Sequence, residues 1–182
     1  MIQTFEAGPW RTNCWIVSDG PGTECFIVDP GMDSADRIRE TVEGQRLKPI
    51  AVLLTHGHID HAGEAKPLAD ELNVPIEGPH EADRFWLARL DDDGKNYGMA
   101  GVTFEPDRWL VEGDTVSVGN LQLDVYETPG HTQGHVIFHH APSKFAQVGD
   151  VLFQGSVGRS DMPGGNHKQL IETIVTKLWP LG

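Results

Sequence analysis

The fold of this chain follows from one stretch, Thr55-His56-Gly57-His58-Ile59-Asp60-His61. The residues before it, Pro49 to Leu54, are nearly all apolar, which is typical of a strand that is buried on both faces. The residues after it, Ala62 to Leu72, have the spacing of a helix. The stretch therefore lies where a buried strand turns into a helix, and it carries three imidazoles and a carboxylate within six residues.

The spacing of these side chains suits metal binding. His56 and His58 are two positions apart on an extended segment, so both can point the same way. Asp60 and His61 follow where the chain turns into the helix. Because the four side chains lie along a bend, they can fill two adjacent metal positions. Imidazole nitrogen and carboxylate oxygen, without cysteine, suit zinc, iron or manganese.

The alternative for this cluster is structural: the histidines would cap the helix or fill hydrogen bonds beside the strand end. A lone histidine is usually explained in that way. Four polar side chains packed this closely at a buried strand end would be costly to desolvate if nothing coordinated them. The density of the cluster therefore favours a metal site.

Length and charge limit the class of protein. At 182 residues the chain can bury one good-sized core, and no break in composition indicates a second domain, so we expect a single domain over residues 1–182. The net charge of −13, with 27 acidic against 14 basic residues, leaves no basic patch for phosphates. We therefore expect no nucleic-acid partner.

The two cysteines and the N-terminus indicate a reducing compartment. Cys14 and Cys25 each lie in an apolar, strand-like run, and we expect two buried free thiols, with a disulfide between neighbouring strands as the alternative. Met1 to Glu6 lacks the basic start and apolar centre of a signal peptide, and no apolar run has membrane-spanning length. We expect a cytoplasmic protein without a membrane partner.

The first part of the chain is predicted to form an antiparallel meander. Its strands are Ile2 to Phe5, Cys14 to Ser18 and Cys25 to Val28. The meander ends in Asp29-Pro30-Gly31, which forces the chain out of the strand and leaves a carboxylate at its tip. Asp29 is a candidate for orienting a ligand histidine, and a role in stabilising the turn is the equal alternative.

A second β-rich part repeats this arrangement. Leu121 to Glu127 alternates apolar and polar residues, as a strand with one face in the core does, and it leads into Thr128 to His135. His131 and Asp150 each stand at the end of a strand-like run, as His56 does, and strand ends that converge on one edge are where sites are built. Together with the first cluster they complete a ligand set.

The residues between these parts offer weaker indications. Asp91 to Gly98 has the composition of a solvated loop, and a mobile flap near a pocket is its functional alternative. His80 is predicted to begin a short helix as a cap or as part of a pocket wall.

Three motifs resemble those of the metallo-β-lactamase superfamily. They are T-H-x-H-x-D-H at 55–61, P-G-H-T-x-G-H at 129–135 and G-D at 149–150, in the same order and over nearly the whole chain. Gly155 to Asn166 resembles the small bacterial glyoxalase II-type, or hydroxyacylglutathione hydrolase-like, branch. The resemblance implies an α/β fold: an αββα sandwich of two mixed β-sheets flanked by helices, with metals at one edge.

The resemblance also implies which residues bind metal. The implied sets are His56, His58 and His131 for a first ion, Asp60 and His61 for a second, and Asp150 as a bridge between them. The family supplies one more histidine from a downstream P-G-H turn, whereas this chain ends at Gly182 after a helix. We therefore expect a chain truncated at its C-terminus, without the last strand and the seventh ligand.

The implied activity is metal-dependent hydrolysis. Two cations deprotonate one water, Asp60 orients the resulting hydroxide, and the same charge stabilises the oxyanion formed on attack. A thioester suits this chemistry because a thiolate leaves with little help from an acid. We therefore expect a thioester hydrolase for a substrate such as S-lactoylglutathione, with two divalent metal ions. Zinc is the first choice, and iron and manganese are the alternatives.

Recognition of glutathione is expected to differ from that in larger glyoxalase II enzymes. Those enzymes hold glutathione with a lysine and a tyrosine, and the corresponding positions here are Arg159 and Asp161. Arg159 is a candidate for binding a substrate carboxylate, and a structural pair with Asp161 is its alternative.

Two other functions remain open from the sequence. The first is a persulfide dioxygenase, in which His56, His131 and Asp150 would hold one iron as a facial triad. The second is a catalytically silent metal-binding protein. The expected partner is a small-molecule thioester, with a glutathione conjugate as the first candidate, and the oligomeric state is left open.

Overall fold

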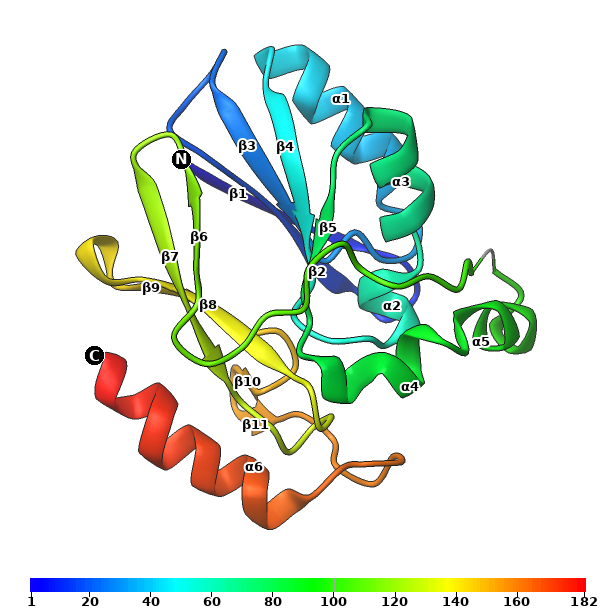
Figure 1. Ribbon diagram of the computed structural model, residues 1–182, viewed down its shortest axis with the longest axis vertical. Coiled ribbons are helices and arrows are strands. Elements are labelled where there is room, and N and C mark those ends of the chain that lie inside the picture. The colour runs from blue at the N-terminus through cyan, green and yellow to red at the C-terminus, as the bar shows by residue number, and fades with distance from the viewer. Residues whose placement is uncertain (100) are drawn as a thin grey trace.

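The larger of the two main β-sheets among the described residues contains the predicted buried strand (Figure 1). The computed structural model describes residues 1–99 and 101–182. The sheet has the order β1-β2-β3-β4-β5, with the strands β1 (Ile2–Ala7), β2 (Thr12–Ser18), β3 (Glu24–Val28), β4 (Lys48–Leu53) and β5 (Ile76–Glu77). The first three pair antiparallel as a meander, and β4 joins β3 and β5 in parallel, so this sheet is mixed.

The second sheet comes from the second β-rich part of the chain. Its order is β6-β7-β8-β9, with the strands β6 (Thr115–Val118), β7 (Leu121–Glu127), β8 (Val136–His140) and β9 (Phe145–Gln147). The described pairs are antiparallel. A small hairpin of β10 (Leu152–Phe153) and β11 (Ser156–Val157) follows.

Helices cover the outer faces of both sheets. Figure 1 shows α1 and α3 beside the first sheet and α6 beside the second. The α-helices are α1 (Ala35–Gln45), α2 (Ile59–Ala62), α3 (Ala65–Leu72), α4 (Arg84–Leu87), α5 (Leu90–Tyr97) and α6 (His167–Thr173). The shorter or irregular turns are η1 (Glu81–Asp83), η2 (Ala141–Ser143), η3 (Ile174–Leu178) and η4 (Trp179–Leu181). Among the residues described, no helix combines the length and apolar character that crossing a bilayer requires.

Three apolar layers hold these elements together. Between the helices and the first sheet, Ile38 and Leu68 pack against the face that carries Val52. Between the two sheets, residues such as Leu53 meet residues such as Phe138. Outside the second sheet, α6 contributes to a third cluster. Burial on both faces of each sheet produces the predicted αββα sandwich, because each apolar face has a partner layer.

One predicted loop is a helix. Asp91 to Gly98 has a loop-like composition, yet α5 spans most of it. Three aspartates occupy the first turn of this helix, where the positive end of the helix dipole favours them. Arg89 also pairs with Asp93 at 3.0 Å, one turn further along. Gly98 then ends the helix in a left-handed conformation.

The two cysteines are free and buried, as predicted. Burial raises the pKa of the Cys25 thiol to about 12. Burial is also the main cause that raises the pKa of Cys14 well above its usual value. Both side chains therefore behave as small apolar groups of the core.

Candidate metal centre

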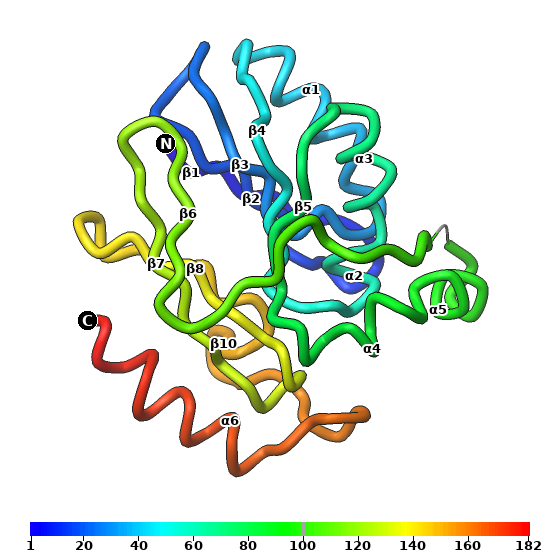
Figure 2. Tube along the Cα trace, viewed as in Figure 1, coloured from blue at the N-terminus to red at the C-terminus, as the bar shows by residue number. Residues whose placement is uncertain are grey.

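The loops that follow β4, β7 and β9 meet at one edge of the sandwich. His56 follows β4, His131 lies between β7 and β8, and Asp150 follows β9. The amide of Val136 at the start of β8 donates to the carbonyl of Thr55 at 2.8 Å, which ties the first loop to the second sheet. The helices α2, α4 and α5 pack together on the adjoining side (Figure 2).

The first predicted ligand set is assembled in the structure. The ring nitrogens His56 Nε2 and His58 Nδ1 lie 3.1 Å apart. His131 Nε2 lies 2.9 Å from His58 Nδ1 and 3.3 Å from His56 Nε2. All three imidazoles are buried. Nitrogen ligands of a tetrahedral zinc ion, at bond lengths of about 2.0–2.1 Å, stand about 3.3–3.4 Å apart, so this triangle has nearly that size.

Neighbouring groups fix the tautomers of two of these rings. The Thr55 hydroxyl donates to Asp29 Oδ2 at 2.8 Å, and it can therefore accept from His56 Nδ1 at 3.1 Å. His131 Nδ1 donates to the carbonyl of Arg159 at 2.7 Å. With the proton on Nδ1 in both rings, two Nε2 lone pairs face each other across 3.3 Å. Such lone pairs repel unless a cation lies between them, so the residues fit a metal ion.

The second predicted set lies beside the first. His61 Nε2 is 3.1 Å from Asp150 Oδ1 and 3.6 Å from Asp60 Oδ2. This nitrogen is buried, and it makes no well-aligned hydrogen bond to any residue that the structure describes. Asp150 turns its other oxygen, Oδ2, toward His131 Nε2 at 3.5 Å. Asp150 thus faces both sets, in the place where a bridging ligand is expected.

The charges of the two sets differ. Burial, together with neighbouring imidazoles, lowers the pKa of His58 to about 2 and that of His56 well below its usual value. Burial alone would lower the pKa of His61, but Asp60, Asp150 and Asp29 raise it well above its usual value. The first set therefore offers neutral lone pairs. The second set favours a positive charge at His61 Nε2, which either a proton or a metal ion supplies.

Asp29 orients part of this centre. Its fully buried carboxylate accepts bonds from Thr55 N at 2.8 Å, His61 Nδ1 at 3.0 Å and Gln147 Nε2 at 3.1 Å. These donors belong to three segments of the chain. The structure thus places Asp29 beside a candidate ligand histidine. Orienting such a histidine is one of the two roles that the sequence leaves open for Asp29. Gly31 is required nearby, because a Cβ there would lie 1.6 Å from the carbonyl oxygen of Asp60.

Asp83, which the sequence did not indicate, ties the two histidine loops together. Its buried carboxylate accepts from Gly57 N at 2.9 Å in the first loop. In the second loop it accepts from the Thr132 hydroxyl at 2.8 Å and from Gly134 N at 2.6 Å. Burial raises the pKa of Asp83, and these three donors oppose that rise. His56 and His131 therefore keep their places partly through a residue outside every motif.

Two further side chains support the centre. Thr12 Oγ1, at the start of β2, donates to Asp60 Oδ2 at 2.8 Å. The ring of His135 stacks on that of His56 at a centroid distance of 4.8 Å, and its Nε2 accepts from the amide of Asp150 at 3.1 Å. In the sequence, the second G-H pair of the motif at 129–135 is the one sign that His135 contributes to the centre. No motif includes Thr12.

The substrate-binding candidate Arg159 lies at the rim of the centre. Its guanidinium makes two bonds of 2.8 Å to the Asp161 carboxylate, and both side chains are exposed. This is the pair given above as the alternative for Arg159. His80 acts as the predicted cap, because its Nδ1 accepts from Ala82 N at 3.1 Å.

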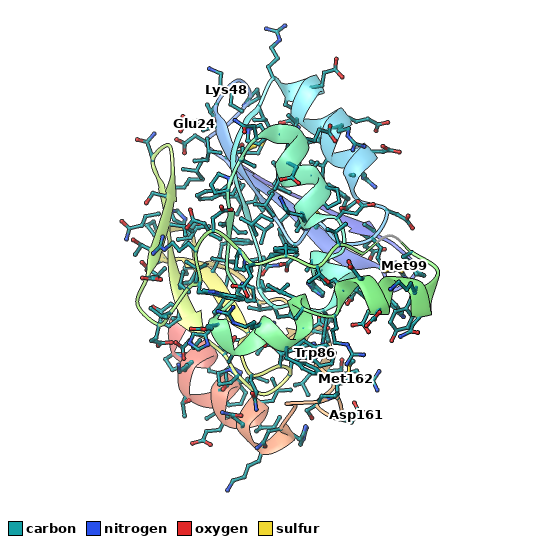
Figure 3. All side chains as sticks on the ribbon, turned by 45° about the vertical axis from the view of Figure 1, so that its right-hand side comes forward. Glu24, Lys48, Trp86, Met99, Asp161 and Met162 are labelled. Atoms are coloured by element: carbon teal, nitrogen blue, oxygen red, sulfur yellow. The ribbon has the colours of Figure 1, made fainter. Side chains whose placement is uncertain are left out.

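A cavity of about 1020 Å³ opens beside the cluster, and residues from both sets line it. Its wall includes Trp86, from α4, and Met162, from the segment before α6; Figure 3 labels both. Trp86 is buried and its ring meets His58 edge-on at a centroid distance of 4.3 Å. A small molecule of moderate size can therefore reach the centre.

Metal-dependent hydrolysis is the chemistry that a His- and Asp-rich pocket at the edge of an αββα sandwich supports, and comparisons with known proteins agree. The chain belongs to the metallo-β-lactamase superfamily: a model of the family described as "Metallo-beta-lactamase superfamily" matches residues 7–181.

Proteins similar to this chain are described with different activities and metals. Hydroxyacylglutathione hydrolase GloC of Haemophilus influenzae is 37% identical over 182 residues, which cover 99% of this chain and 85% of that protein. The solved structure of BLEG-1 B3 metallo-β-lactamase is 33% identical with a TM-score of 0.89, covering 100% of this chain and 87% of that one. The structure of TTHA1623 in a di-iron-bound form is 32% identical with a TM-score of 0.85, covering 99% and 87%.

Proposed function

We propose that this protein hydrolyses thioesters, S-lactoylglutathione among them, with two divalent metal ions, of which zinc is the first choice. The observation that carries the proposal is the placement of Asp150. One of its oxygens lies 3.1 Å from His61 Nε2 and the other 3.5 Å from His131 Nε2. A carboxylate that faces two ligand sets is placed to share its charge between two adjacent ions.

The proposed ligands follow from this placement. They are His56, His58 and His131 for the first ion, Asp60 and His61 for the second, and Asp150 for both. Bound divalent ions supply a water acidified at neutral pH and positive charge beside the carbonyl oxygen that becomes an oxyanion. Asp60 accepts a hydrogen bond from the attacking water. Thr12 holds Asp60 for this task by donating to Oδ2.

A thioester fits these residues because its leaving group is a thiolate. A thiolate is stable enough to depart without a strong general acid. The 37% identity with hydroxyacylglutathione hydrolase GloC supports a hydroxyacylglutathione as the substrate class. Arg159 remains the candidate partner for a glutathione carboxylate, which would replace Asp161 in the bidentate pair.

A one-iron persulfide dioxygenase is less well supported. Such a centre needs His56, His131 and Asp150 alone. His58 and His61 add two buried imidazoles that face the same space. In a one-iron centre His61 Nε2, which is buried without a well-aligned hydrogen bond among the described residues, would stay uncoordinated, and that cost favours a second ion.

The test is a comparison of three reactions on the metal-loaded protein. S-Lactoylglutathione is followed by loss of the thioester absorbance, the β-lactam nitrocefin by its colour change, and glutathione persulfide by oxygen consumption. We expect turnover of the thioester, and we expect Asp60→Asn to reduce kcat by about 10²-fold or more. Asp19→Asn is the control, because Asp19 lies on an exposed turn and bonds only Asn120 among its described partners. Oxygen consumption or β-lactam cleavage without thioester hydrolysis would overturn the proposal.

A further inference from the structure

The mouth of the cavity is aromatic. Trp10 and Tyr97 both line the cavity, and they are 49% and 52% exposed. Phe153 lines it as well and is 42% exposed. Large apolar side chains left half open to water around a pocket mark a surface that a ligand covers. The outer part of the cavity therefore differs in character from the polar centre at its base.

Trp10 and Tyr97 form one surface from two distant segments. Their rings meet edge to face, with centroids 4.9 Å apart and planes at 90°. Trp10 lies in the turn between β1 and β2, and Tyr97 is the last residue of α5. Such an aromatic contact holds both rings in a fixed relation and leaves their outer faces free.

This surface is joined to the reacting end of the pocket. Two residues after Trp10, the hydroxyl of Thr12 donates to Asp60 at 2.8 Å. Trp86 also lines the cavity, and its ring meets that of His58 edge-on. A ligand that reaches from the metal centre to the mouth would thus have Trp86 beside its base and the Trp10–Tyr97 surface at its outer end.

The positive charges of the cavity wall are already partnered. Among the described residues that line the cavity, three are arginines, and each has a carboxylate within 3.0 Å; the pairs are Arg11 with Glu6, Arg89 with Asp93 and Arg159 with Asp161. The mouth therefore offers apolar area more readily than free positive charge. This balance favours a hydrocarbon or aromatic group over a small, strongly polar one.

We propose that Trp10 and Tyr97 form a binding site for an apolar substituent of the thioester, so that substrates with a longer alkyl or aromatic group are preferred over the lactoyl ester. This inference rests on the proposed function. The apolar substituent can belong to the acyl group or to the thiol, because both extend from the same carbonyl carbon. In either case its burial between the rings should improve kcat/KM by roughly fourfold per methylene over the first few carbons.

The experiment uses two substrate series on the metal-loaded protein. In the first, glutathione is kept and the acyl group runs from lactoyl through butanoyl and hexanoyl to octanoyl. In the second, the acetyl group is kept and the thiol runs through alkanethiols of the same lengths. Wild type, Trp10→Ala, Tyr97→Ala and Tyr97→Phe are compared. Trp179→Ala is the matched control, because Trp179 is 66% exposed and lies outside the cavity wall.

We expect kcat/KM to rise with chain length in one of the two series, through KM more than kcat. Trp10→Ala and Tyr97→Ala should flatten that rise by 10-fold or more, measured as the ratio of kcat/KM between the longest and the shortest member of the series. Tyr97→Phe, which keeps the ring, and Trp179→Ala should behave as wild type. Binding of the thioether S-hexylglutathione, measured by calorimetry, gives a readout that needs no turnover, and its affinity should fall about 10-fold in both alanine variants.

The outcomes separate the two proposals. No dependence on chain length in either series, or an equal dependence in the alanine variants, would overturn the aromatic site and leave the thioesterase proposal standing. Failure of the metal-loaded wild type to hydrolyse any member of either series would overturn the proposed function itself.

Discussion

Asp29 and His61 are joined by a hydrogen bond of 3.0 Å between Oδ2 and Nδ1, although they lie 32 positions apart in the chain. The bond places the ring proton on Nδ1 and leaves Nε2 to face Asp150 at 3.1 Å. The orientation of His61 as a candidate ligand is therefore set by a carboxylate at the end of another strand.

Replacing Asp29 should weaken metal binding at the second position. Asp29→Asn removes the negative charge. Its amide N–H also faces one of the groups that donate hydrogen bonds to the carboxylate, so that group loses its acceptor. We expect affinity for the second ion to fall about 10–100-fold, as losses of such orienting groups do. Chelator competition with zinc measures it, and Asp19→Asn again serves as the control. Equal affinity in the two variants would show that Asp29 only stabilises its turn.

The carboxylate of Asp83 should contribute to the stability of the metal-free protein. Asp83→Asn turns an N–H toward either Gly57 N or Gly134 N, so one buried donor loses its acceptor. We expect the free energy of unfolding of the metal-free protein to fall by about 1–3 kcal/mol. Thr132→Val removes only the bond from the hydroxyl and should cost about 1 kcal/mol. Urea denaturation measures both, and a larger loss in Thr132→Val than in Asp83→Asn would contradict this account.

Two glycine-to-alanine substitutions should change the free energy of unfolding in opposite directions. In Gly57→Ala the new Cβ would lie 2.8 Å from Trp86 Cβ and 3.2 Å from the carbonyl oxygen of Asp83, so the first histidine loop must shift. We expect a loss of about 1–3 kcal/mol in the free energy of unfolding. Gly44, inside α1, has open space around its Cβ position, and Gly44→Ala should gain up to about 1 kcal/mol. Thermal denaturation compares them, and a neutral Gly57→Ala would refute the close packing of α4 on this loop.

The thiols should be unreactive in the folded protein. Because burial raises the pKa of Cys25 to about 12, only about 0.01% of that thiol is thiolate at pH 8. Cys14 shifts in the same direction. A thiol-reactive disulfide dye at pH 8 should therefore label neither cysteine until denaturant is added, and should then label both. Rapid labelling of the native protein would show that one of them is exposed.

The residues of the two candidate ligand sets could be expected to lie together from sequence because most of them are local. His56, His58, Asp60 and His61 lie in one stretch, and the strand before them fixes where they point. His131 and Asp150 each follow a strand with a clear apolar pattern. Since strand ends on one edge of a sandwich converge, strand assignment alone brings the two regions together.

The supports of the centre could not be found in this way. Thr12 bonds to Asp60, 48 positions away, and Asp83 accepts a bond from Thr132, 49 positions away. The residues next to Thr12 and Asp83 in the sequence do not distinguish either from an ordinary surface residue. The pairing of Trp10 with Tyr97 likewise depends on where α5 lies. The sequence of that helix wrongly predicts a loop, because three adjacent aspartates are typical of loops but also suit a first helical turn.

A two-ion centre that hydrolyses thioesters requires two bound metal ions and turnover in the same preparation of the protein. Metal per chain is determined by mass spectrometry after purification without added metal, together with S-lactoylglutathione hydrolysis, for wild type and for His61→Ala. We predict close to two ions and turnover in the wild type, and about one ion with at least 10²-fold lower kcat in His61→Ala. One iron per chain in both proteins, without thioester hydrolysis in either, would rule out a two-ion thioesterase.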